Sequence, residues 1–300
     1  MLAIIAPGQG SQTPGMLTSW LEDSAQAELL SSWSESLGLD LVHLGTTADA
    51  EEIKDTANAQ PLIVAAGLLS ANALNLSGKF SYVAGHSVGE ITAASIAGSL
   101  SALDAMKLVR ARGIEMAKAA ATTPAGMSAV LGGDREVVLK AISDLGLVAA
   151  NDNGGGQIVA AGDLDALAAL APEGARVRTL QVAGAFHTHF MSPAVAAFAK
   201  FASTITTSDP TVGVLSNRDG QVLTSGSEIL DRIVSQVANP VRWDLCMSTL
   251  QSSGVTKALE VAPAGTLVGL LKRAVASIEG FAFKSPDDLA VASQFVSSKG

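Results

Sequence analysis

A serine framed by glycines at positions 85–89 is the feature of this sequence that most directly suggests chemistry. The segment reads Gly-His-Ser-Val-Gly, which is the G-x-S-x-G spacing of a nucleophile elbow. In an elbow the serine sits on a sharp turn between a strand and a helix, where a side chain two positions before or after it would collide across the turn. A strand-like run over 80–84 leads in, and a small-residue helical stretch over 90–97 follows. The pattern predicts that Ser87 is a nucleophile.

Such a serine needs a base, because its hydroxyl is a weak nucleophile until its proton is accepted. The chain has four histidines. His86 adjoins Ser87 and is poorly directed for this role, so we expect it to line the site, and His43 has no companion motif. The residues alone leave His187 and His189 open.

One arginine is placed differently from most. The Ser-x-x-Asp pattern at Ser101 is typical of a capping box, and it opens a helix expected to run to about Ala120. On that helix Leu108, Arg112 and Met116 recur at four-residue steps, so Arg112 shares a face with apolar side chains. We therefore expect its guanidinium to point inward.

Bulk composition narrows the function classes. The 300-residue chain is 48% hydrophobic, enough for a sizeable core, and its net charge of −9 argues against nucleic acid, which requires a basic face. The single cysteine, Cys246, excludes an internal disulfide, suits the reducing cytoplasm and is expected to be a small buried hydrophobe. The apolar run 2–6 lacks a basic leader, so we expect no secretory signal.

The longest uncharged stretch, 56–78, has nearly the length of a membrane span. Asn58, Gln60 and Asn72 interrupt it, and each would be costly in hydrocarbon. We predict a buried helix with Pro61 in its first turn and no association with a membrane.

The order of the expected elements indicates an α/β protein with an insertion. The uniformly apolar residues 2–6 are typical of a central parallel strand. From 127 to 182 the pattern becomes β-α-β-β-α-β, which is typical of a ferredoxin-like unit. We predict a large α/β-hydrolase-like domain with a parallel sheet, made of residues 1–122 and 190–300, and an inserted ferredoxin-like α+β small domain, 123–189. The end of the chain after Ser285 is expected to be a loosely held tail.

Seven short motifs then support a family resemblance. In order they are Pro7-Gly8-Gln9-Gly10-Ser11-Gln12, Gln60-Pro61, Gly85-His86-Ser87-Val88-Gly89, Arg112-Gly113, Asn153 with Gln157, Gly184-Ala185-Phe186-His187, and Asn239-Pro240-Val241-Arg242-Trp243. On these motifs the chain resembles the malonyl-CoA:acyl carrier protein transacylases from its start to about residue 275. It departs from the family at Val88, where leucine is frequent, and at 262–265, where a Gly-Pro-Gly-rich loop is usual.

The resemblance implies a role for each matching residue. Ser87 would be the nucleophile and His187 the base, held by the backbone carbonyl of Gln236 in place of an aspartate. The remaining roles would be an oxyanion hole from the backbone N–H groups of Gln9 and Val88, a clamp on the malonyl carboxylate from Arg112, and further substrate contacts from Asn153 and Phe186. Phe186 would fill the space that the branch of a methylmalonyl group needs.

The implied reaction moves a malonyl group from malonyl-CoA to an acyl carrier protein, as in fatty-acid biosynthesis, in the cytoplasm and by a monomer. The coenzyme A thioester is a substrate, and no metal or other cofactor is implied. Carrier proteins of this kind are strongly acidic, so Lys272-Arg273, the only adjacent basic pair, is a candidate docking point.

Two other functions remain open on the sequence. A serine hydrolase of the patatin type would pair Ser87 with the aspartate of an Asp-Gly motif, for which Asp219 is the candidate. A non-catalytic subunit that docks carrier proteins could keep the same fold, but the intact set of Ser87, His187, Gln9 and Arg112 argues against it.

Overall fold

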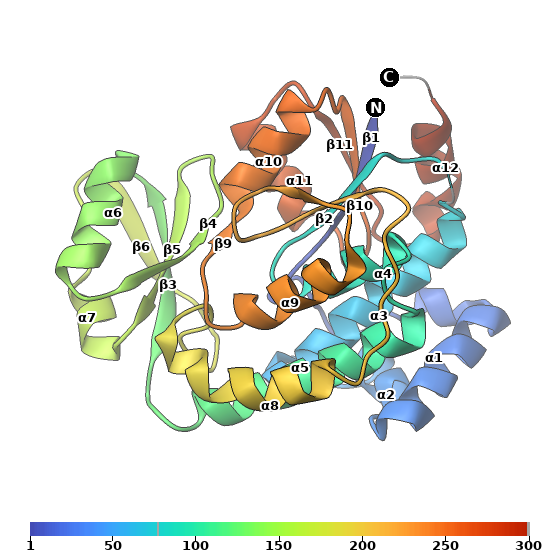
Figure 1. The fold of residues 1–300 in the computed structure, drawn as a ribbon, viewed down its shortest axis with the longest axis horizontal. Helices are drawn as coiled ribbons and strands as arrows, with labels where there is room; N and C mark the ends of the chain where they lie inside the picture. Colours follow the sequence, from blue (N-terminus) through green and yellow to red (C-terminus); the bar gives the residue numbers. More distant parts are fainter. Residues whose placement is uncertain (77, 299–300) are drawn as a thin grey trace.

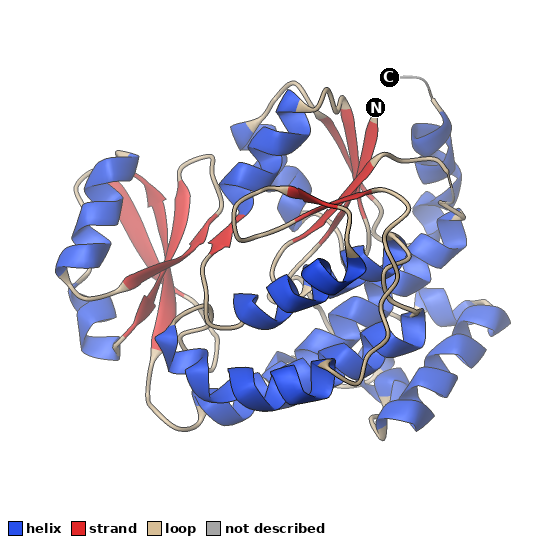
Figure 2. Cartoon of the chain, viewed as in Figure 1, coloured by secondary structure: helices blue, strands red, loops and turns tan. Residues whose placement is uncertain are grey.

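The computed structural model describes residues 1–76 and 78–298 and has a mixed α/β fold with two mixed β-sheets (Figure 1). The six-stranded sheet lies among most of the helices. The five-stranded sheet forms a separate layer at one side, with helices against its outer face (Figure 2).

The larger sheet has the strand order β11-β10-β1-β2-β7-β8. Neighbouring strands from β11 to β7 are parallel, and β8 joins β7 antiparallel, so the predicted parallel sheet holds except at this edge. Its strands are β1 (Leu2–Ala6), β2 (Tyr82–Gly85), β7 (Gly213–Leu215), β8 (Val222–Leu223), β10 (Lys257–Glu260) and β11 (Glu279–Ala282).

β1 is buried on both faces, as its continuous apolar run predicts. Ile4 belongs to the core on the side of α3, whereas Ala3 and Ile5 belong to the core on the side of α10 and α11. The helices that surround this sheet are α1 (Ser24–Leu37), α2 (Leu41–Thr46), α3 (Thr56–Leu74), α4 (Gly89–Ile96), α5 (Ala102–Ala120), α8 (Ser192–Ala202), α9 (Gly226–Gln236), α10 (Trp243–Ser252), α11 (Thr266–Ala274) and α12 (Leu289–Ser297).

The buried helix α3 begins earlier relative to Pro61 than the sequence suggested. The Asp55 carboxylate accepts a hydrogen bond from the Ala57 N–H, so the helix begins at Thr56 and Pro61 lies in its second turn. Because proline has no N–H, the carbonyl of Ala57 has no helical donor at position 61, and the Arg110 guanidinium donates to it at 2.8 Å instead.

The second sheet has the order β6-β3-β5-β4-β9. It follows the predicted β-α-β-β-α-β order through β3 (Gly126–Gly132), α6 (Arg135–Asp144), β4 (Val148–Asp152), β5 (Gln157–Gly162), α7 (Leu164–Ala169) and β6 (Ala175–Thr179). The strand β9 (Val241–Arg242) comes from the later part of the chain and pairs parallel with β4. Val130, Ile142 and Ile158 belong to a separate apolar core between this sheet and its helices.

The end of the chain is not a loose tail over its described part. α12 packs against α3, with Ala292 and Val296 buried, and the ammonium of Lys257 donates to the Phe295 carbonyl. Within the described ranges, none of the helices combines the length and apolarity needed to cross a bilayer.

Candidate active site

Ser87 lies on the tight turn between β2 and α4, with φ of +53° in the left-handed region. The two framing glycines are required by contact distances. A Cβ on Gly85 would lie 1.9 Å from the carbonyl carbon of Gly89, and one on Gly89 would lie 2.3 Å from the Ala6 carbonyl oxygen. The strand, turn and helix expected from the sequence are therefore present, and they lift the Ser87 side chain out of the turn.

His187 meets this serine from a distant part of the chain. It lies between β6 and α8 in the chain and is 3% exposed, with φ of +62°. Its Nε2 lies 2.8 Å from Ser87 Oγ. Ser87 and His187 thus both have a backbone conformation that non-glycine residues rarely adopt, and their side chains are joined by a hydrogen bond.

The backbone carbonyl of Gln236 fixes the tautomer of this imidazole. It lies 2.9 Å from His187 Nδ1, and a carbonyl oxygen can only accept a hydrogen bond, so Nδ1 carries the proton. Nε2 is then the acceptor and is aimed at the Ser87 hydroxyl.

Arg112 is 1% exposed and lies beside the same serine. Its Nη2 donates to Ser87 Oγ at 3.3 Å and to Gln236 Oε1 at 2.7 Å, and its Nη1 donates to Gln60 Oε1 at 2.8 Å. Its Nε has no partner among the described residues. The inward orientation expected for Arg112 is confirmed, and its hydrogen-bond acceptors are two neutral amide oxygens and the Ser87 hydroxyl.

Burial and this charge set the protonation of the site. Desolvation, with the nearby Arg112 charge second, lowers the pKa of His187 to about 3, so the imidazole is neutral at physiological pH. Desolvation also lowers the pKa of Arg112 to about 10, which leaves it charged. The result is a neutral acceptor beside the serine hydroxyl and a cation beside the serine oxygen.

A buried polar network supports the elbow from below. Asn217 Oδ1 accepts the Ser87 N–H at 2.8 Å, and Asn217 Nδ2 donates to the Gly85 carbonyl at 2.7 Å. The Glu90 carboxylate accepts from the Asn217 N–H and from the Gln236 amide, and burial raises its pKa to about 7. Sequence reasoning gave no role to Asn217, Glu90 or Gln60. A single carboxylate among the small apolar residues after the elbow was the available signal for Glu90.

Two backbone N–H groups near the elbow are the donors expected for an oxyanion hole. Val88 follows Ser87 directly, and Gln9 follows β1 at the adjacent strand end. Neither backbone N–H has a hydrogen-bond partner within the part of the chain that the structure describes. Both are therefore available to an incoming oxygen.

A pocket of about 220 Å³ opens onto Ser87 and His187. Gln9, Asn153 and Phe186 line it, as does His86, whose Nε2 lies 2.8 Å from Asn153 Oδ1. The structure therefore brings all eight predicted site residues to this pocket or to the groups directly around it. Among the residues described, no cluster of three or more His, Cys, Asp and Glu side chains is arranged to hold a metal.

Comparison with known proteins places this geometry in a family. A model of the acyl transferase domain matches residues 4–292. The malonyl CoA-acyl carrier protein transacylase of Mycobacterium tuberculosis is 56% identical over 296 residues, which cover 96% of this chain and 98% of that protein. The chain belongs to the malonyl-CoA:acyl carrier protein transacylases.

Solved structures of this family have the same fold. The crystal structure of MCAT from M. tuberculosis superposes with a TM-score of 0.95 at 55% identity, covering 98% of this chain and 99% of that one. A type II PKS acyl-carrier protein in complex with its malonyl-transacylase has a chain that superposes with a TM-score of 0.90 at 30% identity, covering 98% and 99%.

The patatin-type alternative is not favoured. The Asp219 carboxylate forms a salt bridge with Arg232 at 2.7 Å and accepts the Gln221 N–H at 3.0 Å, which are the contacts of a turn residue. It does not line the pocket at Ser87.

Cys246 is fully buried, and burial raises the pKa of its thiol, so it is the inert hydrophobe expected.

Proposed function

We propose that the protein transfers a malonyl group from malonyl-CoA to the phosphopantetheine thiol of an acyl carrier protein, for fatty-acid-type chain elongation. The observation that carries this proposal is the surroundings of Ser87 Oγ, which lies 2.8 Å from His187 Nε2 and 3.3 Å from Arg112 Nη2. A nucleophile, a base and a cation able to bind a carboxylate therefore meet at one atom.

In the first half-reaction, His187 Nε2 accepts the Ser87 proton as Oγ attacks the thioester carbonyl. The backbone N–H groups of Gln9 and Val88 stabilise the negative oxygen, a contribution of about 3–4 kcal/mol for each such donor. The tetrahedral intermediate expels the CoA thiolate, which takes the proton from His187, and a malonyl-Ser87 ester remains. The carrier thiol then reverses these steps and takes the malonyl group.

The carbonyl of Gln236 orients the imidazole but gives the imidazolium no full counter-charge. Burial first and the Arg112 charge second make that imidazolium still less favourable, and together they lower the pKa of His187. A malonyl carboxylate bound to Arg112 would offset this charge and strengthen the base. The same contact would disfavour uncharged acyl groups, because they give the buried guanidinium no counter-charge, a difference of several kcal/mol.

Phe186 and Asn153 would shape the rest of the acyl site. Both line the pocket, and Phe186 is 5% exposed. We assign to Phe186 the exclusion of a branch at the α-carbon, and to Asn153 a contact with substrate in concert with His86, its hydrogen-bond partner.

The architecture supports an enzyme complete in one chain. We propose a large α/β-hydrolase-like domain of residues 1–122 and 190–300, and an inserted ferredoxin-like domain of 123–189, supported by the strand order β6-β3-β5-β4 and by its own core. Because one chain supplies nucleophile, base and cation, we propose that it acts as a monomer in the cytoplasm, with no metal or other cofactor.

Paired half-reactions test the assignment. His187→Ala should slow acylation by malonyl-CoA and transfer to the carrier together, because one base serves both thiols, by about 10²–10⁴-fold. Asp219→Ala is the matched control and should leave both rates unchanged. The reverse pattern, with Asp219 required and His187 dispensable, would favour a hydrolase.

A further inference from the structure

Three arginines line a groove of about 780 Å³ beside the active-site pocket. Arg176 and Arg178 come from β6 and Arg273 from α11, and all three are exposed. In a chain with a net charge of −9, three cations on one groove with no carboxylate among its lining residues form a local positive field.

Arg176 and Arg178 lie on the same face of the sheet because they are two residues apart on the edge strand β6. Arg176 pairs with Leu131 on β3, and Leu131 pairs with Gln157 on β5, so this row of side chains points to one side of the sheet. Arg178 lies two residues further along β6, on the same side. The alternate residues, such as Val130 and Ile158, point to the core under α6 and α7.

None of the three arginines forms a salt bridge with a described residue. Arg273 donates from Nη2 to Gln157 Oε1 at 3.2 Å, which ties α11 to the second sheet and directs this guanidinium to the groove. Three guanidinium groups without a salt bridge to a described residue can bind a phosphate through charge-assisted and bidentate hydrogen bonds.

The groove adjoins the pocket that holds Ser87. Gln157 and Leu180 line both. A substrate whose thioester lies at Ser87 would therefore reach the groove by passing Gln157 and Leu180.

We propose that this groove binds the phosphate attached directly to the pantetheine arm, a group present both in coenzyme A and in the phosphopantetheine of a carrier protein. This inference rests on the proposed function. The charge and position of the groove identify this ligand. In both substrates of that reaction, a pantetheine arm separates a phosphate from the sulfur that reacts at Ser87. One anion site would then serve donor and acceptor in turn.

This proposal gives different roles to Lys272 and Arg273, the basic pair that the sequence analysis named as a candidate docking point. Arg273 lines the groove, whereas its neighbour Lys272 is exposed but does not. On this proposal Arg273 should affect malonyl-CoA as well as the carrier protein, whereas Lys272 remains a candidate docking residue for the carrier alone.

Thioesters that differ only in phosphate content provide the test. Acylation of Ser87 is followed by intact mass with malonyl-CoA, malonyl-phosphopantetheine and malonyl-pantetheine as donors. Arg176→Ala, Arg178→Ala and Arg273→Ala should each raise the apparent KM about tenfold for the two phosphorylated donors, and less than about twofold for malonyl-pantetheine. The KM for holo-carrier protein in the second half-reaction should rise by a similar factor.

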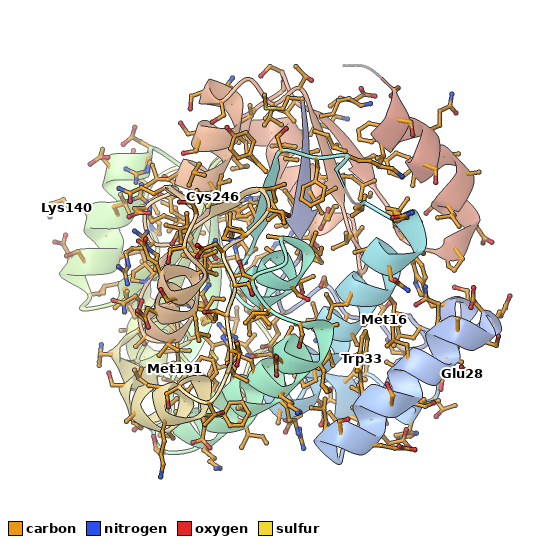
Figure 3. The ribbon with its side chains drawn as sticks, turned by 45° about the vertical axis from the view of Figure 1, so that its right-hand side comes forward. Met16, Glu28, Trp33, Lys140, Met191 and Cys246 are labelled. Atoms are coloured by element: carbon orange, nitrogen blue, oxygen red, sulfur yellow. The ribbon has the colours of Figure 1, made fainter. Side chains whose placement is uncertain are left out.

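Lys140→Ala is the matched control. Lys140 lies on α6 at the outer side of the same sheet (Figure 3), its ammonium forms a salt bridge with Asp144, and its loss should change no KM. Equal losses with malonyl-pantetheine would make the arginines structural, and a loss confined to malonyl-CoA would exclude the shared phosphate; either result overturns the proposal. Wild-type protein that fails to accept malonyl from any donor would instead refute the proposed function.

Discussion

Around the Arg112 guanidinium, oxygens of Gln60, Gln236 and Ser87 already accept hydrogen bonds in the free protein. A malonyl carboxylate must share or replace these neutral acceptors, and it brings the charge that they lack. Because the pair would be buried, removing its cation costs more than breaking a surface ion pair.

Arg112→Ala should therefore reduce kcat/KM for malonyl-CoA by about a hundredfold or more. Activity on acetyl-CoA should fall much less, because no carboxylate contact is lost and the unpaired cation is gone. Acylation rates on the two donors measure the ratio. Equal losses on both would make Arg112 a structural residue, and a matched thermal melt separates misfolding from altered selectivity.

The protonation state of His187 gives a second test at this scale. Its pKa is lowered to about 3 by burial and by Arg112, so in the free enzyme it stays neutral as pH falls from 8 to 5. The pH profile of kcat/KM for acylation should therefore show no His187 limb near 6.5. Arg112→Ala removes one cause of the shift and should move this limb upward. A wild-type midpoint at 6.5 would contradict the assignment.

Phe186 should give partial selectivity for an unbranched donor. One methyl group in an apolar contact is worth about 1–3 kcal/mol, so malonyl-CoA should be preferred over methylmalonyl-CoA by about 10–200-fold. Phe186→Ser should narrow this ratio. Comparable wild-type rates with both donors would show that Phe186 does not limit the space at the α-carbon.

Among the elements, the elbow has the least tolerance for added atoms. Gly85→Ala would place a Cβ 1.9 Å from backbone of Gly89, so the strand and helix would have to separate. We expect this variant to lose several kcal/mol of unfolding free energy, or not to fold. Gly269→Ala, where the nearest atom to an added Cβ is 3.9 Å away, is the control and should be neutral or stabilising by up to about 1 kcal/mol. Similar melting temperatures for both variants would contradict this account of the elbow.

The elements near the site were largely predictable because each has a local cause. A continuous apolar run gives β1, Ser101 caps α5, and the alternation of residues 126–179 gives the second unit. The errors arose where distant contacts decide. Pro61 is tolerated in the second turn of α3 because Arg110 donates to the carbonyl it leaves free, and α12 is ordered by packing on α3.

At the scale of the whole molecule, two buried groups give opposite pH dependences of stability. His187 has a pKa lower than its unfolded value of 6.5, so its contribution is lost as pH falls from 6.5 towards 3. Glu90 has a pKa raised from 4.5 to about 7, so its contribution is lost as pH rises from 4.5 to 7. Each effect is on the order of 3–5 kcal/mol, and between pH 4.5 and 6.5 they oppose each other.

Urea unfolding across pH 4.5–8 should separate the two groups. The free energy of unfolding of Glu90→Gln, taken relative to wild type, should increase as pH rises from 4.5 to 7. That of His187→Gln, taken relative to wild type, should increase as pH falls below 6.5. The readout is the slope against pH, because either substitution also shifts stability by a constant amount. Parallel curves for wild type and both variants would show that neither group titrates as its burial implies.

The site itself was predictable only in part, for a reason of chain topology. Ser87, His187 and Arg112 each belong to a motif with recognisable spacing, and the structure brings them within hydrogen-bond reach. Asn217 supports Ser87 from 130 residues away, through a single pair of hydrogen bonds at the elbow. No local pattern marks such a residue, because its role depends on how β2 and β7 lie side by side.

The mass of the intact protein after mixing with malonyl-CoA tests the central claim most directly. The wild-type chain should gain one malonyl group, which is lost again when holo-carrier protein is added and appears on the carrier. Ser87→Ala should gain none, because the serine oxygen that meets both His187 and Arg112 is removed. A malonyl adduct on Ser87→Ala, or a wild-type chain that transfers malonyl without ever carrying it, would contradict the account.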